Sequence, residues 1–238
     1  MSKLSTPTSE VHIATSTNQL NKLRAAVLGA NDGIVSAAGL VLGVTGAAVS
    51  KETILLSGFA GLISGALSMA AGEFVSVSSQ RDSEKAFLKK TQVHIKKNHD
   101  SEANELIERY QAKGLSEKTA MQVATEFKEN GTLTVELEKE LGIDPDDLTN
   151  PWSAATASAI SFTIGAAIPL LTVLVAPSAV LVPVTVSAVL LSLILTGTLS
   201  ARAGQANQLR AALRVVVWGV GAMIITYIIG HLIGVNIN

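Results

Sequence analysis

The chain has 238 residues, a formal net charge of −1 and no cysteine, and 16% of its residues are charged, against roughly 25% in an average globular protein. With a mean hydropathy of +0.41, this composition excludes an ordinary soluble domain, a disulfide scaffold and any site that needs a thiolate. The near-neutral charge and the low aromatic content (4%) also argue against a nucleic-acid partner.

The charged residues are concentrated in one segment. Residues 80–150 hold 11 of the 18 Lys and Arg and 15 of the 19 Asp and Glu. The remainder of the chain is predominantly apolar. This uneven distribution predicts a membrane protein that carries one polar, water-exposed insert.

In chain order, a polar N-terminal segment precedes five apolar stretches, at 25–49, 53–78, 152–176, 178–201 and 215–235. Each is long enough to cross a bilayer as a helix, which takes roughly 20 residues. The sequence therefore predicts an all-α membrane protein with five transmembrane helices. We divide it into a flexible tail (1–22), two spans (23–79), a helical insert (80–150) and three further spans (151–238).

The basic residues predict how the spans are oriented. Lys and Arg gather before span one, in the insert and between spans four and five, whereas the opposite loops hold only Lys51. Because such residues favour the cytoplasmic side, we expect the N-terminus and the insert in the cytoplasm and the C-terminus outside. The lack of targeting signals and the short tails favour a bacterial cell membrane, and in a eukaryote the same orientation fits a vacuolar membrane.

Asp32 stands within span one, roughly 12 Å of helix rise past Arg24. A carboxylate in the hydrocarbon layer costs at least a few kcal/mol and by default marks an ion path or a proton relay. Asn31 adds an amide oxygen, and Gly29 and Gly33 favour local unwinding that would free backbone carbonyls as ligands. The alternative is an aspartate paired with a basic residue for folding alone, but no Lys or Arg occurs at membrane depth.

The spans are also rich in small residues. Spacing by four lets helix backbones approach closely, which favours simple helix packing over a functional role. Pro169 and Pro183 predict kinks in spans three and four. The glycine pairs with this spacing are Gly29/Gly33, Gly39/Gly43 and Gly61/Gly65.

Span two also contains an acidic residue. Met69 and Glu73 are four residues apart, so their side chains lie on one helical face. A carboxylate binds divalent cations, and a thioether adds preference for a transition metal over Ca²⁺ or Mg²⁺. A methionine that only fills space remains an alternative. The polar residues after Glu73 indicate that it lies near the inner interface, as an entrance residue.

The insert is predicted to be helical, with helices that end at Gly114, Gly131 and Gly142 and with Ser116 as the cap of the second. Acidic pairs on converging helices could form a carboxylate cage for cations. On spacing alone, a solvated acidic face is the simpler interpretation. The pairs are Glu102 with Glu105 and Glu136 with Glu140.

Three runs of this sequence resemble the vacuolar iron transporter family, and the chain looks like a bacterial-type member. They are LRAAVLGANDGIVSAAGLVLGVTGA (23–47), SGALSMAAGEFVSVSSQRDSE (64–84) and ELGIDPDDLTNPW (140–152). The resemblance covers nearly the whole chain. It implies a homodimer in the lipid bilayer that moves Fe²⁺, often Mn²⁺ too, out of the cytosol in exchange for protons. It implies no enzymatic activity, and the metal is the transported substrate, not a permanently bound cofactor.

The resemblance also assigns the metal-binding residues. Asp32 and Met69 match the aspartate and methionine that line the family's path at the dimer interface, and Glu73 is the acid of its Gly-Glu-aromatic motif. In the cytosolic domain, Glu102, Glu105 and Glu140 fall at positions where the family binds metal.

The insert departs from the family pattern. Thr91 and His94 stand where the first insert helix usually brings two glutamates, and Glu136 stands where methionines occur. His94 could still coordinate a transition metal through its imidazole. We therefore predict a weaker or narrower cytosolic site, which would pass metal to Glu73 and then to Asp32 and Met69 of both subunits.

Three other functions compete with this one. An uncoupled divalent-metal channel would use the same residues. A membrane-anchored metal sensor or storage protein would have no need of Asp32. An intramembrane hydrolase is disfavoured because the spans contain neither a nucleophile elbow nor a pair of histidines at HExxH spacing.

Overall fold

The computed structural model describes residues 17–97, 99–129 and 148–237. Five helices in this part are long and apolar enough to cross a membrane, which confirms the predicted all-α membrane protein with five spans. Two shorter helices lie between the second and third of them, and a 3₁₀ turn (Ser178–Val180) precedes the fourth. The spans are α1 (Thr17–Gly46), α2 (Lys51–Lys97), α6 (Pro151–Val175), α7 (Leu181–Ala203) and α8 (Gln208–Ile237), and the insert contains α3 (His99–Ala112) and α4 (Glu117–Glu129).

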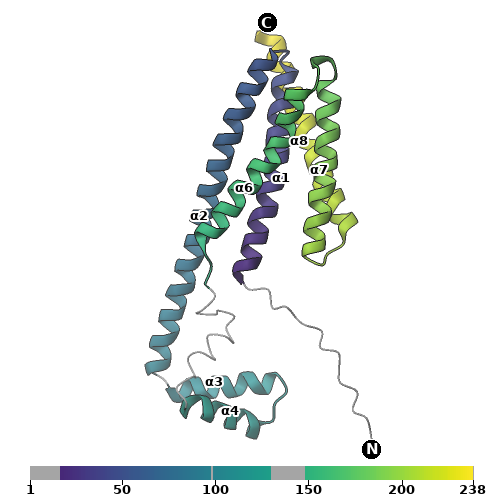
Figure 1. The fold of residues 1–238 in the computed structure, drawn as a ribbon. Helices are drawn as coiled ribbons and strands as arrows, with labels where there is room; N and C mark the ends of the chain where they lie inside the picture. The colour runs from purple at the N-terminus through teal and green to yellow at the C-terminus, as the bar shows by residue number, and fades with distance from the viewer. Residues whose placement is uncertain (1–16, 98, 130–147, 238) are drawn as a thin grey trace, which may run out of the picture.

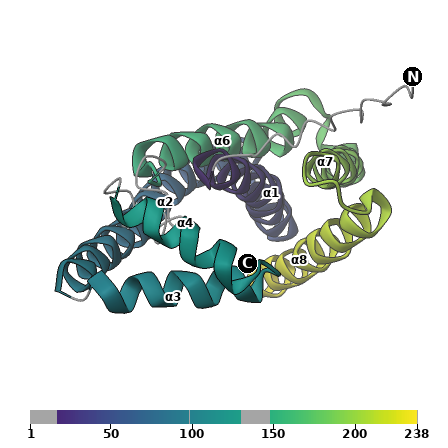
Figure 2. The ribbon, with the colours of Figure 1, turned by 90° about the horizontal axis from the view of Figure 1, so that it is seen from below.

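Helix α1 is the centre of the bundle, because it contacts all four other spans. Figure 2 shows it in front of α6, with α2 on one side and α7 and α8 on the other. One buried cluster joins it to α7 and α8 and contains Ile34, Leu193 and Met223, each at most 3% exposed. A second joins Ala37 of α1 to Phe162 and Ala166 of α6. The central position of α1 means that residues on its different faces meet different helices.

Many large apolar side chains point outward from the bundle. Leu56, Leu67 and Leu191 are each at least 67% exposed, and similar residues lie on α6 and α8. A contiguous surface of this kind is a liability in water and is the expected outer face of helices in lipid. The exposed apolar surface and the helix lengths therefore both indicate a membrane protein.

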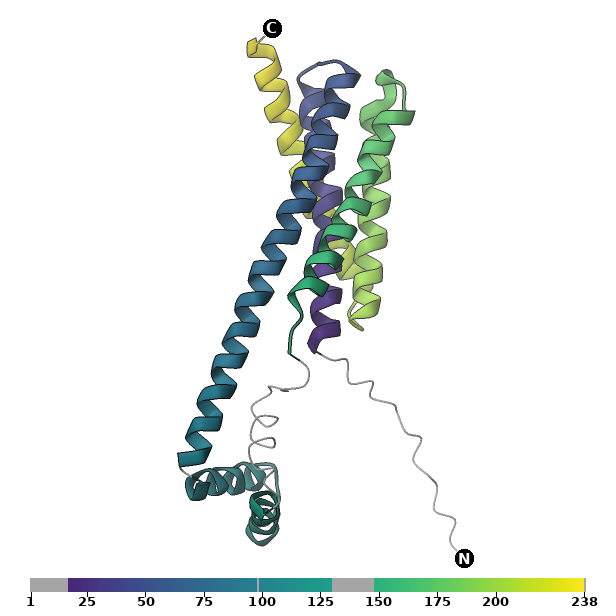
Figure 3. The same cartoon turned by 60° about the vertical axis from the view of Figure 1, so that its left-hand side comes forward.

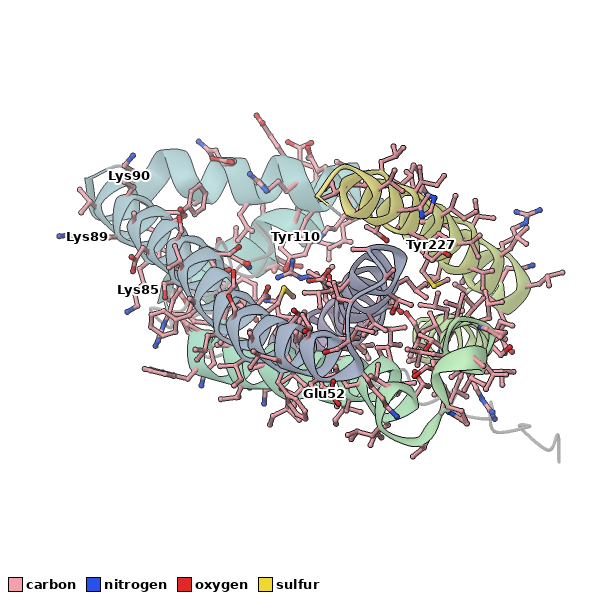
Figure 4. The ribbon with its side chains drawn as sticks, turned by 90° about the horizontal axis from the view of Figure 1, so that it is seen from above. Glu52, Lys85, Lys89, Lys90, Tyr110 and Tyr227 are labelled. Carbon is pink, nitrogen blue, oxygen red and sulfur yellow. The ribbon has the colours of Figure 1, made fainter. Side chains whose placement is uncertain are left out.

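Helix α2 is far longer than a bilayer is thick. Its 47 residues correspond to about 70 Å, against roughly 30 Å of hydrocarbon. Glu52 and Lys90 lie toward its opposite ends (Figure 4), and its second half continues beyond the other spans (Figure 3). At its far end, α3 and α4 pack together through Leu106 and Ala124 (Figure 1). The helix thus carries the insert away from the membrane-spanning part.

Local signals set the helix ends predicted at Gly114 and Ser116, whereas the ends predicted at Gly131 and Gly142 lie outside the described residues. Gly114 has a φ of +97°, a left-handed conformation that glycine adopts without strain. The Ser116 hydroxyl accepts a hydrogen bond from the backbone nitrogen of Thr119 at 3.3 Å, as an N-cap does. Asn150 caps α6 in the same way, through Ser153 at 3.2 Å, and is followed by Pro151.

Two helix boundaries and one expected kink differ from the sequence prediction. Helix α1 already includes residues 17–22, which we had assigned to the tail. Helix α8 begins at Gln208, not near 215, because Asn207 accepts a hydrogen bond from the backbone nitrogen of Arg210 at 3.0 Å and caps it. Pro183 lies in the first turn of α7, where a missing N–H removes no helical hydrogen bond. The kink predicted at Pro183 therefore has no cause.

At the opposite end of the bundle, Lys51 has a defined role. Its Nζ donates to the carbonyl oxygens of Leu174 at 3.2 Å and Ala176 at 3.1 Å. These carbonyls end α6, where helix acceptors lack partners and a positive charge is favourable. Lys51, the first residue of α2, thus connects the start of α2 to the end of α6.

Candidate metal site between α1 and α2

A cavity of about 160 Å³ lies between α1 and α2. It brings together two residues that the sequence singled out, Asp32 and Met69, which are 37 positions apart in the chain. Its wall is completed by Ser36, Ala37 and Leu40 of α1, by Gly58, Gly61, Leu62, Gly65 and Ser68 of α2, and by Phe162 of α6. The donors at this cavity are therefore one carboxylate, one thioether and two hydroxyls.

Asp32 is half-buried and has no ion-pair partner within the part of the chain that the structure describes. The Ser36 hydroxyl, one helical turn later, donates a hydrogen bond to Asp32 Oδ1 at 2.7 Å. A single hydroxyl does not neutralise a carboxylate charge. The hydrogen bond thus holds the carboxylate in position without supplying a counter-charge.

Met69 reaches the cavity from α2 and packs against the cluster of Ala37, Phe162 and Ala166. The glycines of α2 make room there. A Cβ at Gly65 would overlap the ring of Phe162, and a Cβ at Gly61 would lie 2.8 Å from a methyl carbon of Leu40. These glycines let α2 lie close to α1 and α6, which is the packing role that their spacing predicted.

The expected unwinding of α1 around Asp32 is wrong, because the helix is continuous from Thr17 to Gly46. Gly29 and Gly33 instead face α6, where a Cβ at either would overlap the carbonyl oxygen of Ser158 or Phe162. Asn31 does not add its amide oxygen to the cavity of Asp32 either. Its Oδ1 accepts a hydrogen bond from the Thr196 hydroxyl of α7 at 2.8 Å, so it anchors α1 on another side.

Glu73 lies on α2 one turn beyond Met69, but it is not part of the cavity wall. Its Oε1 accepts a hydrogen bond from Arg24 Nη2 of α1 at 2.8 Å, and the two groups form an ion pair. The sequence placed no basic residue at membrane depth. The structure nevertheless gives this second acidic residue a cationic partner from the first turns of α1.

The comparisons with known proteins fit this arrangement. A family model described as the VIT family matches residues 23–231. The chain is 39% identical to vacuolar iron transporter homolog 3 of Arabidopsis thaliana over 213 residues, which cover 89% of this chain and 83% of the relative. It is 38% identical to the vacuolar iron transporter of Acanthamoeba castellanii (88% and 78%) and 37% identical to vacuolar iron transporter homolog 5 of Oryza sativa (87% and 78%).

This chain belongs to the VIT family. The resemblance inferred from the sequence is thereby confirmed, and with it a function in metal transport. These relatives are named as transporters, so this VIT protein is not an enzyme. The cavity that Asp32 and Met69 share is therefore the candidate metal site of this chain.

The predicted ligands in the insert of this VIT protein stay predictions. Glu105 is exposed and accepts hydrogen bonds from Arg109, one turn later, at 2.6 Å and 3.1 Å. This contact is what a solvated acidic face predicts for Glu105. Glu136 and Glu140 lie outside the described residues, as do the side chains of His94 and Glu102.

Sequence reasoning missed the two serines of the cavity, Ser36 and Ser68. The spacing of Ser36 from Asp32 held the necessary signal, since residues four apart share a helical face. Ser68 carried no such signal, because its place depends on how α2 packs against α1.

We expect Ser36→Ala to raise the metal concentration at half-maximal transport by roughly tenfold, because partners that orient a metal ligand are worth 10- to 100-fold in metal affinity. Initial uptake into proteoliposomes measures this value. Ser64→Ala, which changes an exposed hydroxyl on α2 outside the cavity wall, is the matched control. Equal values for the two variants would contradict a role for Ser36.

Proposed function

We propose that this protein exports Fe²⁺ or Mn²⁺ from the cytosol in exchange for protons. The observation that carries the proposal is the shared cavity of Asp32 and Met69. A carboxylate attracts a divalent cation, and a thioether favours a transition metal over Ca²⁺ or Mg²⁺. The relatives named as vacuolar iron transporters support iron as the substrate.

The transport unit in this proposal is a homodimer. One chain supplies a single carboxylate and a single thioether to the cavity, and no group of three or more His, Asp or Glu side chains that could hold a metal occurs among the described residues. A divalent ion takes at least four ligands. A second copy related by two-fold symmetry would double the donors.

A groove between α1 and α8 supports such pairing. Leu40 lines both the cavity beside α2 and a second groove between α1 and α8. The second groove is bordered by small residues, among them Gly39, Gly43 and Gly230. Small residues let helices in a membrane approach closely. A partner subunit seated there would contact Leu40, which also lines the cavity of Asp32.

The orientation follows the basic residues, with the insert in the cytosol and the C-terminus on the far side. In this proposal residues 80–150 collect the metal through Glu102, Glu105, Glu136, Glu140 and His94, and Glu73 receives it. The membrane is the vacuolar membrane if the protein is eukaryotic, as the names of the relatives suggest, and the cell membrane if it is bacterial. Protons compete with the metal for the oxygens of Asp32, which couples the two fluxes.

Transport in proteoliposomes tests the proposal. Purified protein is reconstituted with a pH-sensitive dye inside, and uptake of Fe²⁺ or Mn²⁺ is followed with and without an imposed proton gradient. We expect metal to accumulate above its outside concentration while protons move the opposite way. Metal that only equilibrates, with no change in the dye signal, would identify an uncoupled channel instead.

A further inference from the structure

The two side chains of the ion pair between Arg24 and Glu73 differ in their exposure. The Glu73 side chain is 7% exposed, whereas the Arg24 side chain is 53% exposed. The carboxylate is therefore fixed inside the protein, and the guanidinium approaches it from the surface. Arginine remains charged at any physiological pH, so the carboxylate is neutralised by a cation that belongs to the protein.

The pair lies on the side of the cavity from which the insert departs. Glu73 is four residues beyond Met69, about 6 Å along α2. Arg24 is eight residues before Asp32, about 12 Å along α1. Close by, Ala25, Val77 and Ala154 form a fully buried apolar cluster. An ion that travels between the insert and the cavity along the α1–α2 contact meets the Glu73 carboxylate, which is already paired with Arg24.

We propose that Arg24 is a resident counter-charge that an arriving metal ion must displace from Glu73, so that it gates the insert-side entrance of the cavity. This inference rests on the proposed function. A buried carboxylate without a partner is costly, and exchange of one cation for another leaves Glu73 paired throughout. The half-exposed guanidinium gains hydration when it moves into water, and the divalent ion brings the larger charge.

Two substitutions of Arg24 separate its charge from its packing. Arg24→Gln removes the competing cation and keeps a hydrogen-bond donor, whereas Arg24→Lys keeps the charge. In proteoliposomes, we expect Arg24→Gln to lower the Mn²⁺ concentration at half-maximal uptake by about two- to fivefold, the range that partly exposed ion pairs are worth. Arg24→Lys is expected to shift it less. Equal shifts, or no shift in either variant, would overturn the proposal.

A double-mutant cycle shows whether Arg24 acts through Glu73. In the Glu73→Gln background, the additional change Arg24→Gln is expected to have no further effect on half-maximal uptake. An effect of the same size as in the wild-type background would overturn the proposal.

The charge-swapped protein, Arg24→Glu with Glu73→Arg, tests the simpler view that the pair only fastens α1 to α2. Wild-type thermal stability together with wild-type half-maximal uptake would support that view and overturn ours. We expect the charge-swapped protein to have a wild-type melting temperature but an altered Mn²⁺ concentration at half-maximal uptake. The reason is that the carboxylate then lies on α1 and no longer on α2. A wild-type protein that moves neither Fe²⁺ nor Mn²⁺ would refute the proposed function itself, whereas normal wild-type transport with unshifted Arg24 variants refutes only the gate.

Discussion

Replacing Asp32 with asparagine is expected to reduce metal flux by roughly 100-fold or more. Changes to groups that merely orient a metal ligand cost 10- to 100-fold in affinity, and Asp32 is the only carboxylate among the residues that line the cavity. Asparagine keeps the shape and an oxygen that can accept the hydrogen bond from Ser36. It lacks the negative charge that a divalent ion requires on leaving water.

The loss should not come from misfolding, because removal of a charge from the hydrocarbon layer lowers the cost of inserting α1. Flux per folded protein, with folding checked by gel filtration, measures the effect. Glu52→Gln is the matched control, since it neutralises an exposed carboxylate at the start of α2, outside the cavity wall. Flux of Asp32→Asn equal to that of Glu52→Gln would contradict a carrier that works through Asp32.

The sequence predicted the fold well because the membrane restricts the possibilities. Apolar stretches of the required length could only be spans, and their number is confirmed by the five long helices. Asp32 was identified by its cost in lipid, a property of one residue that needs no knowledge of packing. Met69 was identified by its spacing from Glu73 and by the family resemblance.

The error about Asn31 has a geometric cause. Successive residues of a helix are turned by about 100°, so Asn31 and Asp32 face different helices unless α1 unwinds. The glycines around them suggested unwinding, but they serve instead to let α6 approach. Helical geometry alone would have separated Asn31, which bonds to α7, from the cavity.

The ion pair of Arg24 and Glu73 could not be predicted, because it joins residues 49 positions apart. Its formation depends on the relative register of α1 and α2, which the pattern of neither helix contains. The same limit applies to Ser68 and Phe162, which reach the cavity through helix packing. Sequence reasoning thus identified the residue types of the site but not the contacts between helices.

The second large effect is expected at the crossing of α1 and α6. A Cβ at Gly33 would overlap the carbonyl oxygen of Phe162 and lie 3.0 Å from the backbone nitrogen of Ala166. Backbone atoms cannot rotate away as a side chain can, so the two helices must separate. We expect Gly33→Ala to destabilise the protein by about 2–3 kcal/mol and to lower its apparent melting temperature in detergent by roughly 5–10 °C.

Gly72→Ala is the matched control, because a Cβ at this helical position meets nothing within 4 Å. There alanine only adds helix propensity, worth about 0.5–1 kcal/mol, so the melting temperature should stay the same or rise. If Gly33→Ala and Gly72→Ala had the same melting temperature, Gly33 would not be needed for close packing of α1 on α6. A selective loss at Gly33 would instead tie the position of Asp32 to this crossing, since the residue beside it fixes how closely α1 and α6 approach.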